Sequence, residues 1–516
     1  MVGCSLCVET EKRNIIVKQL IAIDMYTFSS KLKTFSFILM IVGILGIGYG
    51  FLTAPKDIQE VKQILAAQEH GHEGHEAAQH EDQVAEVPVQ GKVAAPVASD
   101  TTNTSHDSLS VAAVSNLGPP TEATSVVASH KKETTKEEIA AEHEAHLKHV
   151  LGQLQNKPWS ALYVACIFFM LISMGVLAFY AIQQVAQAGW SPVLFRVMQG
   201  ITAYLPVGSI IFFVILLLCG MHMNHLFPWL EKGVTEVGNA NYDKIIANKS
   251  GYLNFPFWII RAAIFLGGWN LYRYFSRKNC LAQDESDDNS FYKKNLNISA
   301  MFLVFFIVTE SIMSWDWIMS IDPHWFSTLF GWYVFASFFV SGITTICMVT
   351  VYLKTKGYLE NVNTSHIHDL AKFMFGFSVF WTYLWFSQFM LIWYANIPEE
   401  VTYFVTRIEL YNLPFFGAVV MNFVFPILIL INTDFKRITW ILVMASTVIL
   451  LGHYIDFFNM VMPSSVGDQW FIGASEIGSV LFFFGLFIFV VFTALTKAPL
   501  LPKRNPYIEE SKHFHY

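Results

Sequence analysis

The residues of this sequence best suited to chemistry are ionisable side chains that stand within or directly beside long apolar stretches. A charge buried in hydrocarbon is costly, so each such group must be paired, hydrated or functional. Histidines and desolvated carboxylates can accept and release protons near neutral pH. Their clustering toward one end of the apolar stretches predicts a proton path or a quinol-oxidising pocket, with these candidates: Arg261, Glu310, Asp316, Asp322, His324, His453, Asp456 and Glu476.

Structural roles compete with these interpretations. Arg261 could neutralise Glu310 or Asp316 as an ion pair, and His324 could cap a helix. We expect Glu310 to be the critical carboxylate, because it lies past the middle of its apolar stretch, where water is scarce.

Composition places these residues in a membrane. Hydrophobic residues make up 54% of the 516-residue chain and charged residues 14%, whereas soluble domains carry about 25% charged residues. The net charge of −7 argues against a nucleic-acid partner. We therefore expect an all-α polytopic membrane protein with about ten transmembrane helices. The expected spans are 34–53, 159–187, one that ends near 221, 255–275, 296–320, 325–353, 370–394, 413–431, 438–460 and 472–495.

The distribution of lysine and arginine orients these spans, since loops rich in these residues stay in the cytoplasm. Alternate loops carry most of the cations, from Arg196 through Arg277 and Lys354 to Arg504. Both termini should then be cytoplasmic, in a bacterial inner membrane. The expected divisions are a cytoplasmic N-terminus at 1–33, of which 1–24 would precede the true start, a first helix at 34–53, a periplasmic linker at 54–157, a membrane domain at 158–502 and a cytoplasmic tail at 503–516.

The expected periplasmic linker is rich in alanine, glutamate and histidine, and its two ends have helical spacing. Its histidines could form a weak zinc or copper site, although a solvated linker is the favoured interpretation. The candidate metal ligands are His70, His72, His75, His143, His146 and His149.

No ligand set for a tightly bound cofactor is evident. Cys4 and Cys7 form a Cys-x-x-Cys, but Val8 stands where c-type haem attachment needs histidine. Histidines inside the apolar stretches cluster at one depth, which disfavours a wire of two b haems. Gly46 and Gly50 form a Gly-x-x-x-Gly in the first span, which predicts close helix packing.

Three segments together carry a family resemblance. They are SIMSWDWIMSIDPHWFSTLFGWYVFASFFVSG at Ser311–Gly342, FSQFMLIWYANIPEE at Phe386–Glu400 and HYIDFFNMVMP at His453–Pro463. The chain resembles the second NrfD-like, quinone-type membrane subunit of bacterial Alternative Complex III, of the Bacteroidetes type. The similarity extends over Trp159–Pro502.

The resemblance implies a fold of two paired four-helix bundles with peripheral helices. It implies a complex in which electrons pass from menaquinol to cytochrome c or another acceptor, through iron–sulfur centres and c haems held on partner subunits. A paralogous NrfD-like subunit has the stronger claim to the quinol site. The present chain would contribute a proton path or structural support, and the proton path would map to Glu310, Asp316, His324, His453, Asp456 and Glu476. A terminal oxidase is a further potential partner.

Two other functions remain open. The chain could be a purely structural anchor of the redox complex. A secondary transporter is disfavoured, because its halves show no matching helix breaks at glycine or proline.

Overall fold

The computed structural model describes residues 25–66 and 136–515, with side chains from His143 onward in the second range. Every regular element in these ranges is a helix, which confirms the all-α prediction. Besides a helix at 58–66, the elements are α2 (Ser30–Thr53), α4 (Lys136–Val185), η1 (Pro192–Leu194), α5 (Phe195–Ile201), α6 (Tyr204–Gly220), η2 (Pro228–Leu230), α7 (Lys244–Lys249), α8 (Phe255–Gln283), α9 (Ser290–Trp317), η3 (Met319–Ile321), α10 (Phe330–Thr355), α11 (Thr364–Ala395), α12 (Pro398–Glu409), α13 (Asn412–Val419), η4 (Val420–Val424), α14 (Phe425–Leu430), η5 (Phe435–Arg437), α15 (Thr439–Val466), α16 (Ala474–Leu495) and α17 (Ile508–Lys512).

Nine of the spans in the described ranges are long and apolar enough to cross a membrane, so the chain is a polytopic membrane protein. The span expected at 255–275 is helical as α8, but it is not among the nine. Arg261 and Asn270 make α8 more polar than its neighbours. Its 29 residues still measure about 43 Å at 1.5 Å per residue, which exceeds the hydrocarbon thickness of a bilayer.

The two compact units of the chain are Asp57–Val150 and the remainder, which holds the other helices. Helices at 58–66 and from Lys136 confirm that both ends of the expected linker are helical. Pro158, where the membrane domain is expected to begin, lies inside α4, which continues through this proline. A proline removes one backbone N–H, and long helices of membrane proteins tolerate that loss where neighbouring helices pack around it.

α4 is the central helix of the larger unit, and its apolar part is almost wholly buried. Phe168 packs on Phe457 of α15, and Phe169 packs on Phe487 of α16. On the other side, Tyr163 contacts Phe212 of α6. The core of the unit therefore forms around α4.

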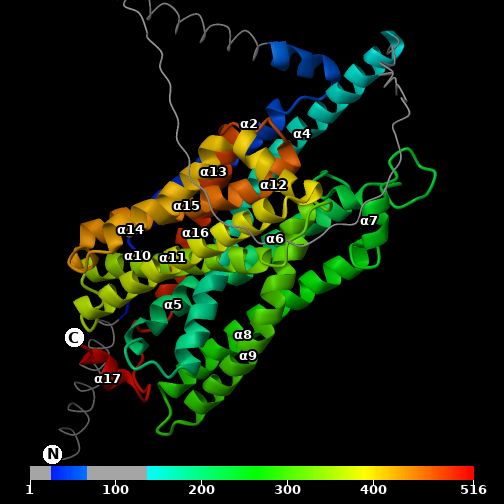
Figure 1. Cartoon of the computed structure of the whole chain (residues 1–516). Helices are drawn as coiled ribbons and strands as arrows, with labels where there is room; N and C mark the ends of the chain where they lie inside the picture. The colour runs from blue at the N-terminus through cyan, green and yellow to red at the C-terminus, as the bar shows by residue number, and fades with distance from the viewer. Residues whose placement is uncertain (1–24, 67–135, 516) are drawn as a thin grey trace, which may run out of the picture. The chain divides into compact units, whose positions relative to one another are not determined.

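The helices divide into two sets that follow the chain order, and Figure 1 shows α8 beside α9 in the first set and α10 beside α11 in the second. In the first set, α8 packs against α6 and α9, with α4 bonded to α9 through the Tyr163 hydroxyl and the Trp317 carbonyl. The second set is made of α10, α11, α13–α14 and α15, and α10 also packs against α9. The arrangement is compatible with the paired bundles that the resemblance implies.

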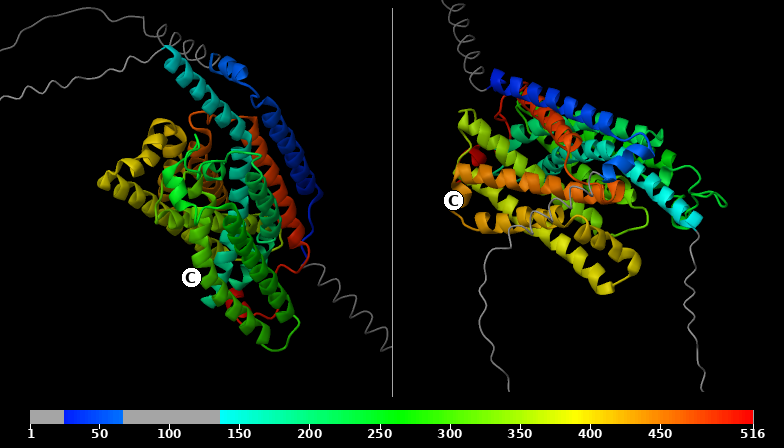
Figure 2. Two further views of the ribbon diagram at one scale, coloured as in Figure 1. Left: turned by 90° about the vertical axis from the view of Figure 1, so that its right-hand side faces the viewer. Right: turned by 90° about the horizontal axis from the view of Figure 1, so that it is seen from above.

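Small residues set two close crossings. A Cβ added at Gly342 of α10 would lie 2.8 Å from the Val176 nitrogen of α4, so only glycine allows this approach. At Gly46 of α2 an added Cβ would lie 2.8 Å from the Gly478 Cα of α16. The predicted packing role of the Gly46 motif is thus confirmed, and Figure 2 shows α2 lying along α16.

The segment Asn396–Asn412, which we expected to be a loop, contains the amphipathic helix α12. α12 buries Tyr403, Phe404 and Arg407 and exposes its other face. Pro398 begins the helix, where its missing N–H has no intrahelical acceptor to lose. This short helix brings Arg407 to the site described next.

Candidate functional site: a buried carboxylate cluster

Two of the predicted residues, His453 and Asp456, meet inside the second helix set. They are three residues apart on α15, so they share one helix face. α10 adds Tyr333 and Ser337 with a four-residue spacing, and α11 adds Trp381. All five side chains are buried.

Asp456 is the acceptor at the centre of this cluster. Tyr333 donates its hydroxyl to Oδ1, while the Ser337 hydroxyl and the Trp381 Nε1 donate to Oδ2, each at 2.8 Å. These three donors are neutral, and they satisfy a carboxylate that has left water. In the described part of the chain, neither arginine nor lysine is bound to this carboxylate, and His453, 3.8 Å away, pairs with it only when protonated.

His453 is the proton-accepting partner in this geometry. Its Nδ1 lies 3.0 Å from the Ser337 Oγ, whose single proton is already donated to Asp456. Nδ1 must then carry the proton in a neutral His453, which leaves Nε2 as the basic nitrogen. Nε2 has no hydrogen-bond partner within the described ranges. The cluster thus combines a fixed carboxylate with a free, buried proton acceptor.

A buried arginine lies beside this cluster. The Arg407 guanidinium stacks on the Tyr403 ring at 3.3 Å and donates to the Asn459 and Tyr403 carbonyls at 3.0 and 2.8 Å. It also interacts electrostatically with Tyr333. Arg407 therefore places positive charge near the tyrosine that holds Asp456.

Arg261 and Asp316 form a separate buried ion pair. The Arg261 Nε lies 2.6 Å from Asp316 Oδ2 and its Nη2 lies 2.9 Å from Oδ1, while the Tyr252 hydroxyl donates to Oδ1 at 2.8 Å. The Trp258 Nε1 donates to the Asp316 carbonyl at 2.9 Å. Both carboxylate oxygens are occupied, so this geometry supports the structural role.

Glu310 lies six residues before Asp316 on α9, a little less than two turns, and is buried. Ser311 donates to its Oε2 at 3.1 Å, and the Ser314 hydroxyl lies 3.5 Å from Oε1. Among the described residues no cation pairs with it, and Arg261 is engaged by Asp316 instead. The structure therefore does not bring Glu310 together with Arg261.

Glu476 caps its own helix. Its Oε2 accepts from the Gly473 N–H at 2.8 Å and from the Ser475 hydroxyl at 2.9 Å, at the start of α16. Lys157 and Tyr454 interact with it electrostatically. The bond from the Gly473 N–H is one half of a capping box; the other half is missing because glycine has no side chain.

Asp322 and His324 lie in the turn between α9 and α10. The His324 Nε2 is 2.6 Å from Oδ2 of Asp243, the residue that caps α7, and Lys249 donates to the Pro323 carbonyl at 2.6 Å. The backbone N–H of Ile246, followed by the His324 ring, lowers the pKa of Asp243. Because Lys249 also interacts with Asp322, these contacts tie the turn to the α6–α8 loop.

The histidine-rich candidates divide between two parts of the chain. His70, His72 and His75 lie outside the described residues. His143, His146 and His149 are exposed on α4. The described part of the chain holds no group of three or more histidine, cysteine or acidic side chains arranged for a metal ion.

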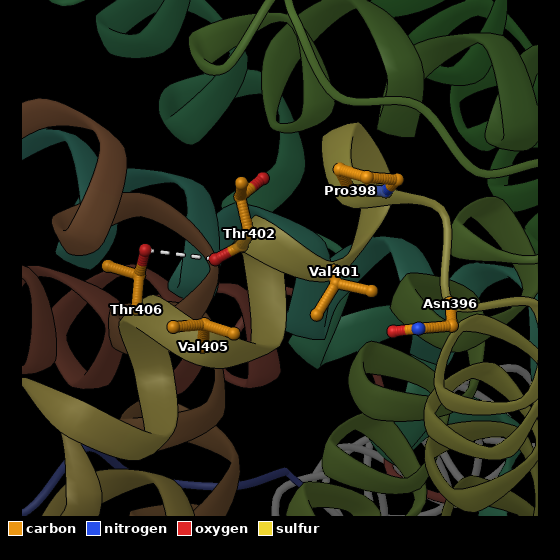
Figure 3. Close-up of a pocket in the computed structure, with 6 residues that line it drawn as sticks. All are labelled: Asn396, Pro398, Val401, Thr402, Val405 and Thr406. Carbon is orange, nitrogen blue, oxygen red and sulfur yellow. Dashed lines mark hydrogen bonds between the residues drawn. The ribbon is translucent and has the colours of Figure 1, made fainter. Parts of the chain in front are cut away.

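An open groove of about 360 Å³ lies beside α12 (Figure 3). Its lining contains no titratable side chain, and the Thr406 hydroxyl donates back to the Thr402 carbonyl at 2.9 Å. Val401 and Val405 supply apolar surface. The groove therefore offers no proton chemistry of its own.

The sequence reasoning missed the partners that define the cluster: Tyr333, Ser337 and Trp381. The hydroxyls of Tyr333 and Ser337 are four residues apart and so share one face of α10, which was the available signal. Nothing along the chain pairs Trp381 with Asp456, since they are 75 residues apart.

A scan against protein-family models finds no family that matches this chain, and a search of curated proteins finds no similar sequence.

Proposed function

We propose that this polytopic membrane protein is a subunit of a respiratory complex that oxidises a quinol and reduces cytochrome c or another electron acceptor. Its contribution would be a proton path, a quinone-binding surface, or both. The observation that carries the proposal is the buried cluster of His453 and Asp456 with Tyr333, Ser337 and Trp381.

The chemistry of the cluster fits proton handling. Quinol oxidation releases protons, which need an acceptor close to the quinol or along an exit route. His453 Nε2 is such an acceptor, and protonated His453 would be stabilised by Asp456, whose Oδ2 lies 3.8 Å from Nδ1. The low polarity around these groups strengthens that interaction.

The resemblance described above supplies the rest of the proposal. The chain itself would hold no tightly bound cofactor, and menaquinone would be the quinol. The proposed partners are a paralogous NrfD-like subunit, an iron–sulfur subunit, c-type haem subunits and a terminal oxidase. The chain alone would then not be a complete enzyme. The proposed location is a bacterial inner membrane, with both termini cytoplasmic.

A purely structural anchor is the alternative that one observation favours. Both carboxylate oxygens of Asp316 accept hydrogen bonds in the Arg261–Asp316 pair, and no further ligand is needed to explain it. A structural role for this pair does not account for the free His453 Nε2.

The test is to replace carboxylates by amides in the assembled complex. Asp456→Asn and Glu310→Gln should assemble with normal haem and iron–sulfur content, and should lower quinol oxidation or proton release by about 100-fold, as loss of a positioned proton-transfer group does. Glu409→Gln, the same chemical change at an exposed position of α12, is the matched control. Wild-type turnover and proton release in Asp456→Asn would remove the basis of the proposal.

A further inference from the structure

A second buried polar cluster lies where α4 and α8 end and α9 begins, next to the loops that carry most of the cations. It centres on the Tyr180 hydroxyl of α4. Four donor groups lie within hydrogen-bond distance of this oxygen: the side-chain amides of Gln184, Gln199 and Asn295 at 3.2, 3.2 and 3.1 Å, and the Ser276 hydroxyl at 3.2 Å. All five residues are buried.

Four donors exceed what one hydroxyl oxygen can accept, because it has two lone pairs. The Gln184 Oε1 and the Asn295 Oδ1 have no hydrogen-bond partner in the described part of the chain. Flipping a side-chain amide exchanges the positions of its NH₂ donor and its oxygen acceptor. Either orientation therefore leaves one polar atom of the amide without a partner. Buried polar groups in this state are characteristically satisfied by water.

The same two amides line a cavity of about 10 Å³, close to the room that one water needs. Cys280, Asp284 and Asn505 line it as well. At its edge, Asp284 pairs with the buried Arg196, which donates to the Gln199 Oε1 at 3.0 Å. A charged pair thus stands between the loops and the amide cluster.

Hydroxyl groups continue from this cavity toward the middle of the helices. The Ser276 hydroxyl donates to Tyr180 and also interacts with the Tyr272 hydroxyl, which lies 2.8 Å from the Ser299 Oγ. The order is therefore Tyr180, Ser276, Tyr272 and Ser299. A row of hydroxyls can pass a proton without net change, because each oxygen accepts one proton and releases its own.

The row ends against apolar rings. The Phe302 ring stacks on Tyr272 with centroids 4.0 Å apart, and Phe306 lies one turn further along α9. Glu310 is 11 residues beyond Ser299, about 16 Å along the helix axis. Phe302 and Phe306 therefore separate the hydroxyl row from the nearest buried carboxylate of α9.

We propose that this cavity binds water and that the row Tyr180–Ser276–Tyr272–Ser299 is a proton inlet, closed at its inner end by Phe302 and Phe306. Its function as an inlet rests on the proposed function, whereas its hydration does not. Protons would enter beside Asp284, on the face that the cation-rich loops predict to be cytoplasmic.

Hydration is tested with Cys280, which lines the cavity. In a Cys4→Ser/Cys7→Ser background, the folded protein is treated with methyl methanethiosulfonate and analysed by mass spectrometry. Cys280 should react, while Cys166, Cys219 and Cys347, which are buried elsewhere in the helices, should react only after denaturation. A Cys280→Ser variant identifies the labelled site. A Cys280 that reacts only after denaturation would overturn the hydrated cavity.

Proton entry is tested separately in the reconstituted complex. Tyr272→Phe and Ser276→Ala each remove one hydroxyl from the row, and should lower proton uptake by about 100-fold while haem and iron–sulfur content stays normal. Tyr411→Phe is the matched control. Among the described residues, the buried Tyr411 hydroxyl bonds only to the Gly467 carbonyl, and it lies outside the row. Unchanged uptake in both Tyr272→Phe and Ser276→Ala would refute the inlet.

These tests separate the inlet from the function on which it rests. Labelling of Cys280 reads water access whatever the complex does. If Asp456→Asn fails to impair turnover while Tyr272→Phe slows proton uptake, the inlet stands and the proposed role of the Asp456 cluster falls.

Discussion

The surroundings of each buried carboxylate decide what that residue can do. Asp316 has a cation and a tyrosine on its two oxygens, whereas Asp456 has three neutral donors and Glu310 has two serines. Removing a paired charge leaves its partner buried and uncompensated, which costs far more than removing a group held by neutral donors. Stability measurements can therefore separate structural carboxylates from functional ones.

The first prediction concerns the Arg261–Asp316 pair. Arg261→Met should destabilise the protein by about 3–5 kcal/mol, because Asp316 would stay buried without its cation. Replacing both partners, as Arg261→Met with Asp316→Leu, should recover much of that loss. The measurement is thermal unfolding of the detergent-solubilised protein. Equal stability of the single and double variants would contradict the structural role of the pair.

At the level of elements, α2 packs against α16 at Gly46 and Gly478, a contact that we call the glycine seam. We predict that Gly46→Leu will force α2 away from α16, since an added Cβ would meet the Gly478 backbone. Gly48→Leu is the matched control, because an added Cβ there meets nothing within 4 Å. Limited proteolysis near residues 25–30 should become faster in Gly46→Leu only. Equal cleavage of both variants would show that the seam does not hold α2.

The loop between α6 and α8 should respond to pH through His225 and Glu231, whose side chains approach to 3.6 Å. The nearby Glu231 carboxylate raises the pKa of His225 above its ordinary 6.5, and the nearby His225 ring lowers the pKa of Glu231 below its ordinary 4.5. The His225 contribution is full below pH 6.5 and is lost as pH rises through its folded pKa. The Glu231 contribution is full above pH 4.5 and is lost as pH falls through its folded pKa.

The third prediction follows from these signs. Protection of this loop from amide hydrogen exchange, corrected for the intrinsic rate, should be greatest between pH 4.5 and 6.5. The effect should be below about 1 kcal/mol, because both side chains are about half exposed and water screens their interaction. Glu231→Gln should flatten the profile. An unchanged profile in that variant would assign the pH response to other groups.

Much of this architecture could be predicted from the sequence, because a membrane span consists of a continuous run of apolar residues. Expected spans match α9, α10, α11 and α15 to within several residues at each end. The helix α12 was missed, since its apolar residues recur on one face of a short polar segment. The start of the span expected at 159–187 was placed too late, because α4 already runs through Pro158; proline usually ends helices in water but not among packed helices.

The site was predictable only in part, for a different reason. The energetic cost of burying an ionisable side chain points to single residues, and it identified His453, Asp456 and Glu310 correctly as buried ionisable groups. It does not say which residues meet. Arg261 lies 49 residues from Glu310 and 55 from Asp316, and only the packing of α8 on α9 decides between them. The Tyr180 cluster was missed because amides and hydroxyls carry no charge that would mark them.

At the scale of the whole molecule, the sides of the membrane on which the two termini lie depend on whether α8 crosses it. Nine spans of the described ranges are apolar enough to cross, and an odd number would put the two termini on opposite sides. If α8 also crosses, the number becomes ten and both termini lie on one side, as the cation distribution predicts. α8 packs along both α6 and α9, and its 29 residues suffice to span a bilayer.

The fourth prediction tests this crossing with a pair of single cysteines in a background without other accessible thiols. Val237→Cys and Asn289→Cys place exposed thiols in the two loops that flank α8. If α8 crosses, an impermeant thiol reagent added to intact cells should label Val237→Cys alone, and inside-out vesicles should give the reverse. Labelling of both variants from the same side would mean that α8 does not cross. The termini would then lie on opposite faces, and Arg261 and Asp316 would pair at the membrane surface instead of within it.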